Sequence, residues 1–287
     1  MSESDSRVHN ATQVVGDRDS FVLRPTPWAG GASDLGLRHV INQDALAIAA
    51  GGDQLGENTA VVTLSDGVST SEYSEFAAKV AADSACQTLA AALDTVDRRP
   101  ENLAVAMVDA FITANAEVVM QAGPNPGISW ACTLICVAVT PDQVLVGNAG
   151  DSRCYWIDDD GNALLLSADD SVAAARMRAG MSREEAESGA DAHAITKWLG
   201  PGALDIMPSI QTFDLVRPGW ILACSDGLWN YASSPREMAE LLHGFVSKRS
   251  DAGLSEAAMV SSKLVEWAKS NGGRDNISVG LVRVPME

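Results

Sequence analysis

Blocks of apolar and polar residues succeed one another along the chain, and their spacing predicts both helices and strands. Apolar side chains recur at i, i+3 and i+4 across residues 71–93 and again across 103–118, which indicates two helices. Gly123 and Pro124 end the second of them. Short apolar runs between turn residues predict strands. We expect strands at about 31–36, 44–50, 58–65, 129–139, 143–147, 152–157, 206–215, 220–225 and 275–282.

The second half of the chain carries clear helix-start signals. Ser234, Pro235 and Glu237 supply an N-cap, a first-turn proline and a capping-box glutamate for a helix that ends near Phe245. A further helix is expected at about 255–269. Residues 170–192 are rich in Ala, Met and charge, and Ser182 with Glu185 has capping-box spacing. This segment is therefore predicted to be an insertion of short helices, which we interpret as a flap.

The order of these elements predicts the fold class. Strands, two helices, strands, two helices and a final strand follow one another with no fixed-period repeat and no linker-like segment. Adjacent short strands favour antiparallel pairing, and helices that come in pairs favour a layered arrangement. We predict an α+β fold with two central, mostly antiparallel sheets and a helix pair outside each. Residues 1–20 are expected to be a flexible arm, and residues 21–287 a single domain.

The amino-acid composition limits which classes of partner the protein can bind and indicates its cellular compartment. The 287 residues include 38 Asp and Glu against 20 Lys and Arg, a net charge of -18, which disfavours nucleic acid and anionic membranes. An acidic, solvated surface is an equally good explanation of that charge. Five cysteines form no CxxC pair and are interpreted as buried apolar residues in a reducing compartment. With neither a leader pattern nor an apolar run of membrane-spanning length, we expect a soluble cytoplasmic monomer.

Carboxylates at strand ends are the candidate chemistry. Asp66 and Asp226 each end an apolar run and precede a glycine, and Asp275 opens the last predicted strand. Any one Asp-Gly pair is most often only a turn signal. Asp44 and Asp151 add two more acids at predicted strand ends, without a thiol or imidazole cluster nearby. Oxygen-only donors favour Mg2+ or Mn2+ over Zn2+.

Together these motifs resemble a known family, the metal-dependent protein phosphatases of type 2C, which dephosphorylate phosphoserine and phosphothreonine. The resemblance runs from about residue 32 to 284 and keeps the order of the family's motifs. These motifs are Gly-Leu-Arg-His at 36–39, Asn-Gln-Asp at 42–44, Ser-Asp-Gly at 65–67, Gly-Asp-Ser-Arg at 150–153, Ser-Asp-Gly-Leu at 225–228 and Asp-Asn-Ile-Ser at 275–278. The family's fold, an αββα four-layer sandwich, agrees with the predicted layers.

The resemblance implies a role for each acid. Asp66 matches the carboxylate that bridges two metals, and the Gly67 carbonyl matches a ligand of the second. Asp226 and Asp275 match ligands of the first metal, and Asp151 matches an acid associated with a third. Asp44 matches an acid that holds metal-bound water. Two cations can share a water, lower its pKa and direct the resulting hydroxide at phosphorus, so Ser65 and Ser225 are interpreted as strand-end residues and not as nucleophiles.

Several positions depart from the family's pattern. Gln43 stands where a glutamate usually binds the second metal, and its neutral amide should weaken that site. His39 stands at the position of the phosphate-binding arginine, one residue after Arg38; if the strand continues, the two side chains point opposite ways. His39 is then either a phosphate ligand or a loop hydrogen-bonding group. Residues 68–70 lack the usual glycines, and residues 169–171 read Asp-Asp-Ser instead of Asp-His-Ser.

Three hypotheses follow. The leading one is a bacterial-like, Mn2+- or Mg2+-dependent phosphatase with two or three metals, which acts on phosphorylated proteins and opposes a Ser/Thr kinase. The second is a catalytically impaired binding or regulatory module, because Gln43 lacks the charge of the usual glutamate. The third is a phosphatase of small phosphate monoesters.

Overall fold

Two antiparallel sheets form the centre of the protein. The structure is a computed structural model, and it describes residues 13–51, 55, 58–95, 99–124, 129–189, 191–192, 194–246 and 256–284. The first sheet has the order β1-β2-β3-β12-β11-β8-β9 and the second β10-β7-β6-β5-β4. All the pairings described in both sheets are antiparallel. This confirms the predicted sheet type.

The strands of the seven-stranded sheet are β1 (Gln13–Gly16), β2 (Ser20–Arg24), β3 (Ala29–Asp34), β8 (Arg153–Asp158), β9 (Ala163–Leu165), β11 (Gly219–Cys224) and β12 (Ile277–Val284). Those of the five-stranded sheet are β4 (Asp44–Ala50), β5 (Ala60–Asp66), β6 (Leu134–Val139), β7 (Gln143–Ala149) and β10 (Ser209–Asp214). The central strands β6 and β11 are buried along their whole length, as their continuous apolar runs indicate.

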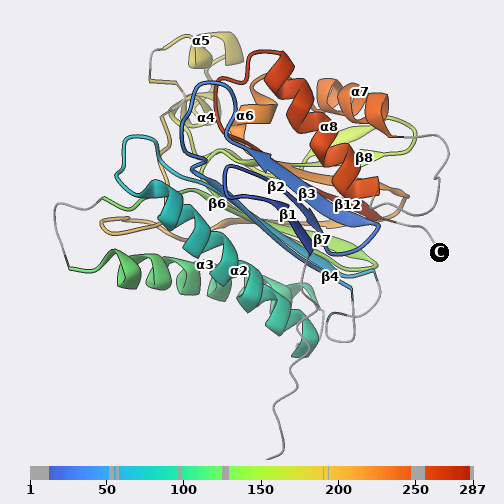
Figure 1. The fold of residues 1–287 in the computed structure, drawn as a ribbon, viewed down its shortest axis with the longest axis horizontal. Helices are drawn as coiled ribbons and strands as arrows, with labels where there is room; N and C mark the ends of the chain where they lie inside the picture. The colour runs from blue at the N-terminus through green and yellow to red at the C-terminus, as the bar shows by residue number, and fades with distance from the viewer. Residues whose placement is uncertain are drawn as a thin grey trace, which may run out of the picture.

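Helix pairs cover the two outer faces of the sheets, so the predicted αββα order is confirmed (Figure 1). Helices α2 (Ser74–Thr95) and α3 (Pro100–Ala122) pack on the five-stranded sheet. On the seven-stranded sheet lie α7 (Pro235–Phe245) and α8 (Glu256–Ser270). The capping box predicted at Ser234 and Glu237 is present at the start of α7.

Each interface between layers has its own apolar core. Leu46, Val62 and Ile221 belong to the cluster between the two sheets. Phe111 of α3 belongs to the cluster beneath α2 and α3, and Leu264 of α8 to the one beneath α7 and α8. By length and composition α3 could cross a membrane, but its buried face, which includes Phe111, packs in this core.

All five cysteines are buried and free, as the sequence predicts. They are Cys86, Cys132, Cys136, Cys154 and Cys224. Burial raises the pKa of both Cys86 and Cys132 to about 12, so these thiols stay protonated at neutral pH.

The segment interpreted as a flap folds into two short helices, α4 (Val172–Arg178) and α5 (Arg183–Glu187). They lie at the end of the sandwich where α6 (Asp226–Trp229) begins (Figure 1). Ser182 and Glu185 form the predicted capping box, and Arg176 binds Asp191 through two hydrogen bonds of 3.0 and 2.9 Å.

Three expectations need correction. The strand β1 lies inside the expected arm of residues 1–20, because residues 13–16 pair with residues 21–24 of β2; residues 1–12 lie outside the described part of the chain. The strand expected at 31–36 ends at Asp34, and a turn follows. Asp226 begins the short helix α6, whereas the sequence suggests only a turn after the strand.

Candidate metal centre

The five predicted acids come from the ends of strands in both sheets. Asp44 begins β4 and Asp66 ends β5, and the two residues are direct antiparallel partners. Asp226 follows β11 as the first residue of α6, and Asp275 lies two residues before β12. Asp151 lies two residues after β7. The sandwich therefore brings together acids that are separated by up to about 230 residues in sequence.

These carboxylates raise one another's pKa. Burial is the largest cause for Asp66, followed by the charges of Asp44, Asp226 and Asp151, and the pKa of Asp66 lies well above its usual value. The pKa of Asp226 is also raised by burial, then by the charges of Asp151 and Asp275. Such mutual effects require the carboxylates to lie within electrostatic reach of one another in a weakly solvated site.

Asp44 and Asp151 have pKa values near neutrality. Burial raises the pKa of Asp44 to about 7, although hydrogen bonds from Ser225 and Ser278 oppose the shift. Burial also raises the pKa of Asp151 to about 7, together with the charge of Asp169. Both groups therefore bind protons much more readily than an exposed aspartate does.

A network of serines that the sequence motifs do not predict orients Asp44. The buried Ser225 hydroxyl donates a 2.8 Å hydrogen bond to Asp44 Oδ2 and accepts one from the backbone N–H of Ser278. Ser278 in turn contacts the hydroxyl of Ser33 at 2.7 Å. Because the Ser225 hydroxyl is fully buried beneath Asp44, it acts as an orienting group and not as a nucleophile. Its position just before Asp226 is the signal that could have suggested this role.

The donor chemistry fits a divalent cation. Asp44 Oδ1 and Asp226 Oδ1 are both buried without a hydrogen-bond partner. A buried carboxylate oxygen without a partner is costly, and a hard cation is the partner that such oxygens bind best. Among the described residues, no group of three or more Asp, Glu, His or Cys side chains is arranged so that it could hold a metal ion. The fit therefore rests on the oxygen donors and on these two unpartnered atoms.

Gln43 lies beside this cluster. Its side-chain Nε2 donates a hydrogen bond of 2.5 Å to the hydroxyl of Ser74 at the start of α2. Its backbone carbonyl accepts a hydrogen bond from Gly67, and its backbone N–H donates to Asn276 Oδ1. The Asn276 side chain also donates to the carbonyls of Leu35 and Ile41 and so holds the loop before β4.

His39 and Arg38 occupy that loop, in which residues 36–38 form a turn. The His39 ring Nε2 lies 3.2 Å from Asp275 Oδ1, and the Arg38 side chain is exposed. Side chains alternate between the two faces of a strand, but Arg38 and His39 lie in this loop and not in a strand. Alternation therefore does not fix the directions of these two side chains. His39 thus contacts Asp275, a predicted metal ligand. Arg38 gives the loop a cationic side chain, and His39 gives it an ionisable one.

Asp169 and Asp170 are held by basic residues. Arg153 is buried, donates to both carboxylate oxygens of Asp169 at 2.7–3.1 Å, and its Cζ lies 3.7 Å from the centre of the Trp229 ring. Asp170 accepts a long hydrogen bond from Gly150 and lies 4.0 Å from Lys197. These acids therefore support the backbone around Asp151.

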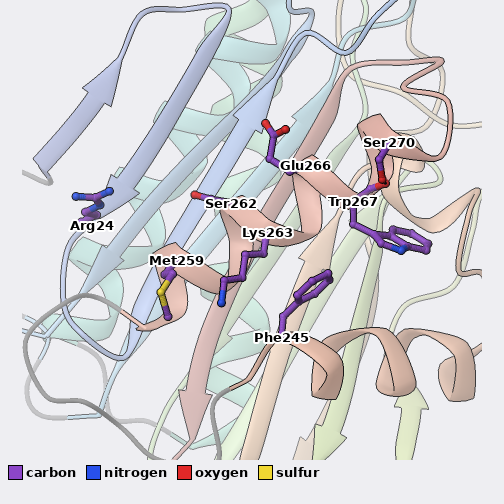
Figure 2. A pocket seen from close by; sticks show the side chains of 8 residues that line it. All are labelled: Arg24, Phe245, Met259, Ser262, Lys263, Glu266, Trp267 and Ser270. Carbon is purple, nitrogen blue, oxygen red and sulfur yellow. The ribbon is translucent and has the colours of Figure 1, made fainter.

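A separate cavity of about 570 Å³ lies on the outer face of α8, on the far side of the seven-stranded sheet from the sandwich interior (Figure 2). Its lining residues include Arg24, Phe245, Lys263 and Trp267. None of the five acids contributes to it.

An αββα sandwich with a buried acidic cluster at the strand ends defines a four-layer α+β protein with a candidate site for divalent metal. Comparison with known proteins identifies the family: residues 38–267 match the model described as protein phosphatase 2C, and the chain belongs to that family. Members of the family are metal-dependent.

Individual relatives agree. The chain is 33% identical over 171 residues to a protein of Listeria innocua named serine/threonine phosphatase stp. That match covers 58% of this chain and 63% of the relative, so the chain spans less than two thirds of it. A crystal structure of the phosphatase MsPP from Mycobacterium smegmatis has a TM-score of 0.65 and 28% identity, and covers 90% of this chain and 98% of its own. Stp1 from Staphylococcus aureus gives a TM-score of 0.73 at 23% identity, over 90% of this chain and 95% of its own.

Proposed function

We propose that this protein is a phosphatase that hydrolyses phosphoserine and phosphothreonine in proteins and uses Mn2+ or Mg2+. The observation that carries the proposal is the buried cluster of acids with unpartnered oxygens on Asp44 and Asp226. Family membership and the names of the relatives support the same reaction. Two cations in such a site would activate water and neutralise charge on the phosphoryl oxygens.

We propose a separate role for each residue of the site. We assign Asp66 and the Gly67 carbonyl, together with Asp226 and Asp275, as the groups that would hold two cations. Asp151 is assigned to a third, weaker cation. Asp44, which Ser225 orients, is placed to hold the attacking water by hydrogen bonding and to accept its proton, since the pKa of Asp44 is raised to about 7 by burial.

His39 and Arg38 are the candidate phosphate ligands. His39 lies 3.2 Å from Asp275, so a phosphoryl group bound near Asp275 would be within its reach. Arg38 is exposed on the same turn and can supply a permanent positive charge. The phosphorylated substrate would be the product of a Ser/Thr kinase, and we further propose a cytoplasmic monomer.

The binding-module alternative depends on Gln43. Its amide can offer a cation only a neutral oxygen, and its Nε2 donates to Ser74. All five assigned acids, Asp44, Asp66, Asp151, Asp226 and Asp275, are nevertheless present in the sequence, which supports an enzyme. A preference for phosphopeptides over small esters would separate the protein phosphatase from the small-molecule alternative.

Phosphate release from a phosphothreonine peptide tests the proposal. We expect Mn2+-dependent hydrolysis that EDTA abolishes and that Asp226→Asn reduces by at least about 100-fold, since loss of a ligand should exceed loss of an outer-shell partner. Asp94→Asn, an exposed acid at the end of α2, is the matched control and should leave the rate unchanged. Hydrolysis that survives both EDTA and Asp226→Asn would refute the proposed mechanism.

A further inference from the structure

Three aromatic side chains form a partly exposed surface, which we call the aromatic ledge: Tyr73, Phe76 and Trp130. The Phe76 and Trp130 rings stack at 6.0 Å and 21°, and Tyr73 contacts Phe76 at 6.2 Å. Tyr73 is 49% exposed and Phe76 42% exposed. An apolar core would bury such rings, so the ledge leaves aromatic area free to pack against another group.

The ledge adjoins Gly67, the candidate metal ligand, on two sides. Ser74 follows Tyr73 directly, and its carbonyl lies 2.8 Å from the position that a Cβ on Gly67 would take. On the other side, Ala131 follows Trp130, and its carbonyl accepts a 2.9 Å hydrogen bond from Val68. Two ledge residues therefore directly precede residues that contact the backbone at Gly67 and Val68, and a peptide bound at the acids would lie near them.

The backbone of Tyr73 is in the left-handed region, with φ of 61°. Bulky residues rarely adopt this conformation, and glycine would adopt it without strain. Strained residues of this kind cluster at ligand-binding positions, where the side chain is needed. Tyr73 is 49% exposed and belongs to none of the apolar clusters found among the described residues, so core packing does not explain the choice of tyrosine.

Arg18 decides which kind of side chain the ledge can accept. Its guanidinium carbon lies 4.9 Å from the centre of the Phe76 ring, so a cation already occupies that aromatic face. Arg18 comes from the turn between β1 and β2, and Asp19 of the same turn accepts a hydrogen bond from Asn42, next to Gln43. A second cation on the ledge would be repelled by Arg18, whereas an apolar or aromatic side chain would not.

We propose that the aromatic ledge binds a bulky apolar side chain of the phosphoprotein, next to the phosphorylated residue, and so selects substrates. The proposal rests on the proposed function for the identity of its ligand. It assigns Tyr73 and Phe76 to substrate positioning and leaves the reacting groups to the acids.

The test compares a set of phosphothreonine peptides. Each carries phenylalanine at one position that flanks the phosphothreonine, and the reference peptide has alanine at all these positions. We expect one Phe position to raise kcat/KM by about 10-fold, mainly through KM, because an aromatic contact is worth about a factor of ten. Tyr73→Gly and Phe76→Ala should remove that preference, and Tyr73→Phe should keep it. Hydrolysis of p-nitrophenyl phosphate, which has no residue flanking its phosphate, should fall less in each variant than hydrolysis of the Phe peptide.

Two controls separate binding from folding. Phe245→Ala removes an aromatic ring of α7 in the opposite helix layer and should leave the peptide preference intact. Tyr73→Gly removes backbone strain as well as a ring, so its Tm should change by less than about 2 °C. No preference at any position in the wild type, or an equal loss of p-nitrophenyl phosphate hydrolysis in Tyr73→Gly, would overturn the proposal.

A binding measurement distinguishes failure of the ledge from failure of the proposed function. Fluorescence polarisation of the labelled Phe peptide, without phosphate, should report binding that Phe76→Ala weakens. If no phosphate ester is hydrolysed with Mn2+, the proposed function fails, and this binding alone would support an apolar ligand at the ledge. If esters are hydrolysed but Phe and Ala peptides bind and react alike, only the ledge fails.

Discussion

Gln43 would limit the negative charge of the proposed metal site. Its amide oxygen is neutral, and its amide nitrogen donates to Ser74, so this position adds no negative charge to the cluster around Asp66. A carboxylate here would attract a cation strongly, since two unit charges about 4 Å apart interact by about 4 kcal/mol at an effective dielectric constant of about 20. The departure from the usual glutamate therefore affects affinity more directly than it affects the fold.

We expect Gln43→Glu to tighten binding of the weaker Mn2+ at least about 10-fold, because ligand charge tunes the affinity of such sites. Isothermal titration of the metal-free protein measures the change. Gln87→Glu, which adds the same charge on an exposed position of α2, is the control and should have little effect. Affinity that stays the same or falls in Gln43→Glu would contradict the assignment of this position.

The ionisation of Asp44 should make the stability of the metal-free protein depend on pH. The pKa of Asp44 is about 7 in the folded protein because it is buried, and about 3.9 in an unfolded chain. Between these values the folded state binds more protons than the unfolded state, so the free energy of unfolding must decrease as pH rises. The cost of ionising Asp44 is complete above about pH 7, and a bound cation would relieve it.

In EDTA, the Tm of the wild type should therefore fall between about pH 5 and pH 8 by more than that of Asp44→Asn, which has no carboxylate to ionise at this position. Asparagine can still accept the hydrogen bond from Ser225. Parallel Tm profiles for the two proteins would show that ionisation of Asp44 does not influence stability.

At the level of elements, Arg153 ties the strand β8 to the segment that leads into α4. It binds Asp169 through two nitrogens, donates to the Ser233 hydroxyl and lies over the Trp229 ring. The side chains of Arg153 and Asp169 are only 6% and 11% exposed. A buried pair of this kind is costly to break, because the remaining charge has no compensation.

Asp169→Ala should lower the free energy of unfolding by about 3 kcal/mol, as measured by urea denaturation. Glu240→Ala removes the exposed partner of Arg236 on α7 and should cost no more than about 0.5 kcal/mol. The double variant Arg153→Met/Asp169→Leu should recover most of the loss, since it removes both charges. Similar losses in Asp169→Ala and Glu240→Ala would show that the pair contributes no more than a surface ion pair.

The sequence predicts elements well where their signals are local. The capping boxes at Ser182 and Ser234, and the buried strands β5, β6 and β11, are visible in short stretches of sequence. The short edge strands β1 and β9 are missed, because strands of this length carry too few residues to show alternation and depend on a neighbouring strand for pairing.

In the candidate site, too, local signals are predicted from the sequence and contacts between distant residues are not. Motif order is enough to group the five acids, because each stands beside a strand-end turn. The contact of His39 with Asp275, the serine network under Asp44 and the pairing of Arg153 with Asp169 join residues far apart in sequence. Such contacts depend on loop conformation and on how the sheets stack, which no local pattern encodes.

At the scale of the whole molecule, the packing of the sandwich requires the two sheets to approach each other closely. Gly31 of β3 and Gly280 of β12 are direct partners across the seven-stranded sheet. A Cβ on Gly280 would lie 2.6 Å from the Cγ1 of Val62 in the opposite sheet, and one on Gly31 would lie 2.5 Å from Leu46 Cδ2. These glycines let the sheets pack tightly between strands that carry the acids, since Asp275 precedes β12 and Asp66 ends β5.

Gly280→Ala should therefore destabilise the protein by about 1–3 kcal/mol through overpacking, and it should also weaken Mn2+ binding because it moves β12 relative to β5. Gly244→Ala, in α7 with open space where a Cβ would lie, is the matched control and should stabilise by about 0.5–1 kcal/mol. Adding Val62→Ala to Gly280→Ala restores room at the contact and should recover both stability and metal affinity. A Gly280→Ala variant that unfolds at the wild-type urea concentration and binds Mn2+ normally would show that the spacing of the sheets does not set the geometry of the site.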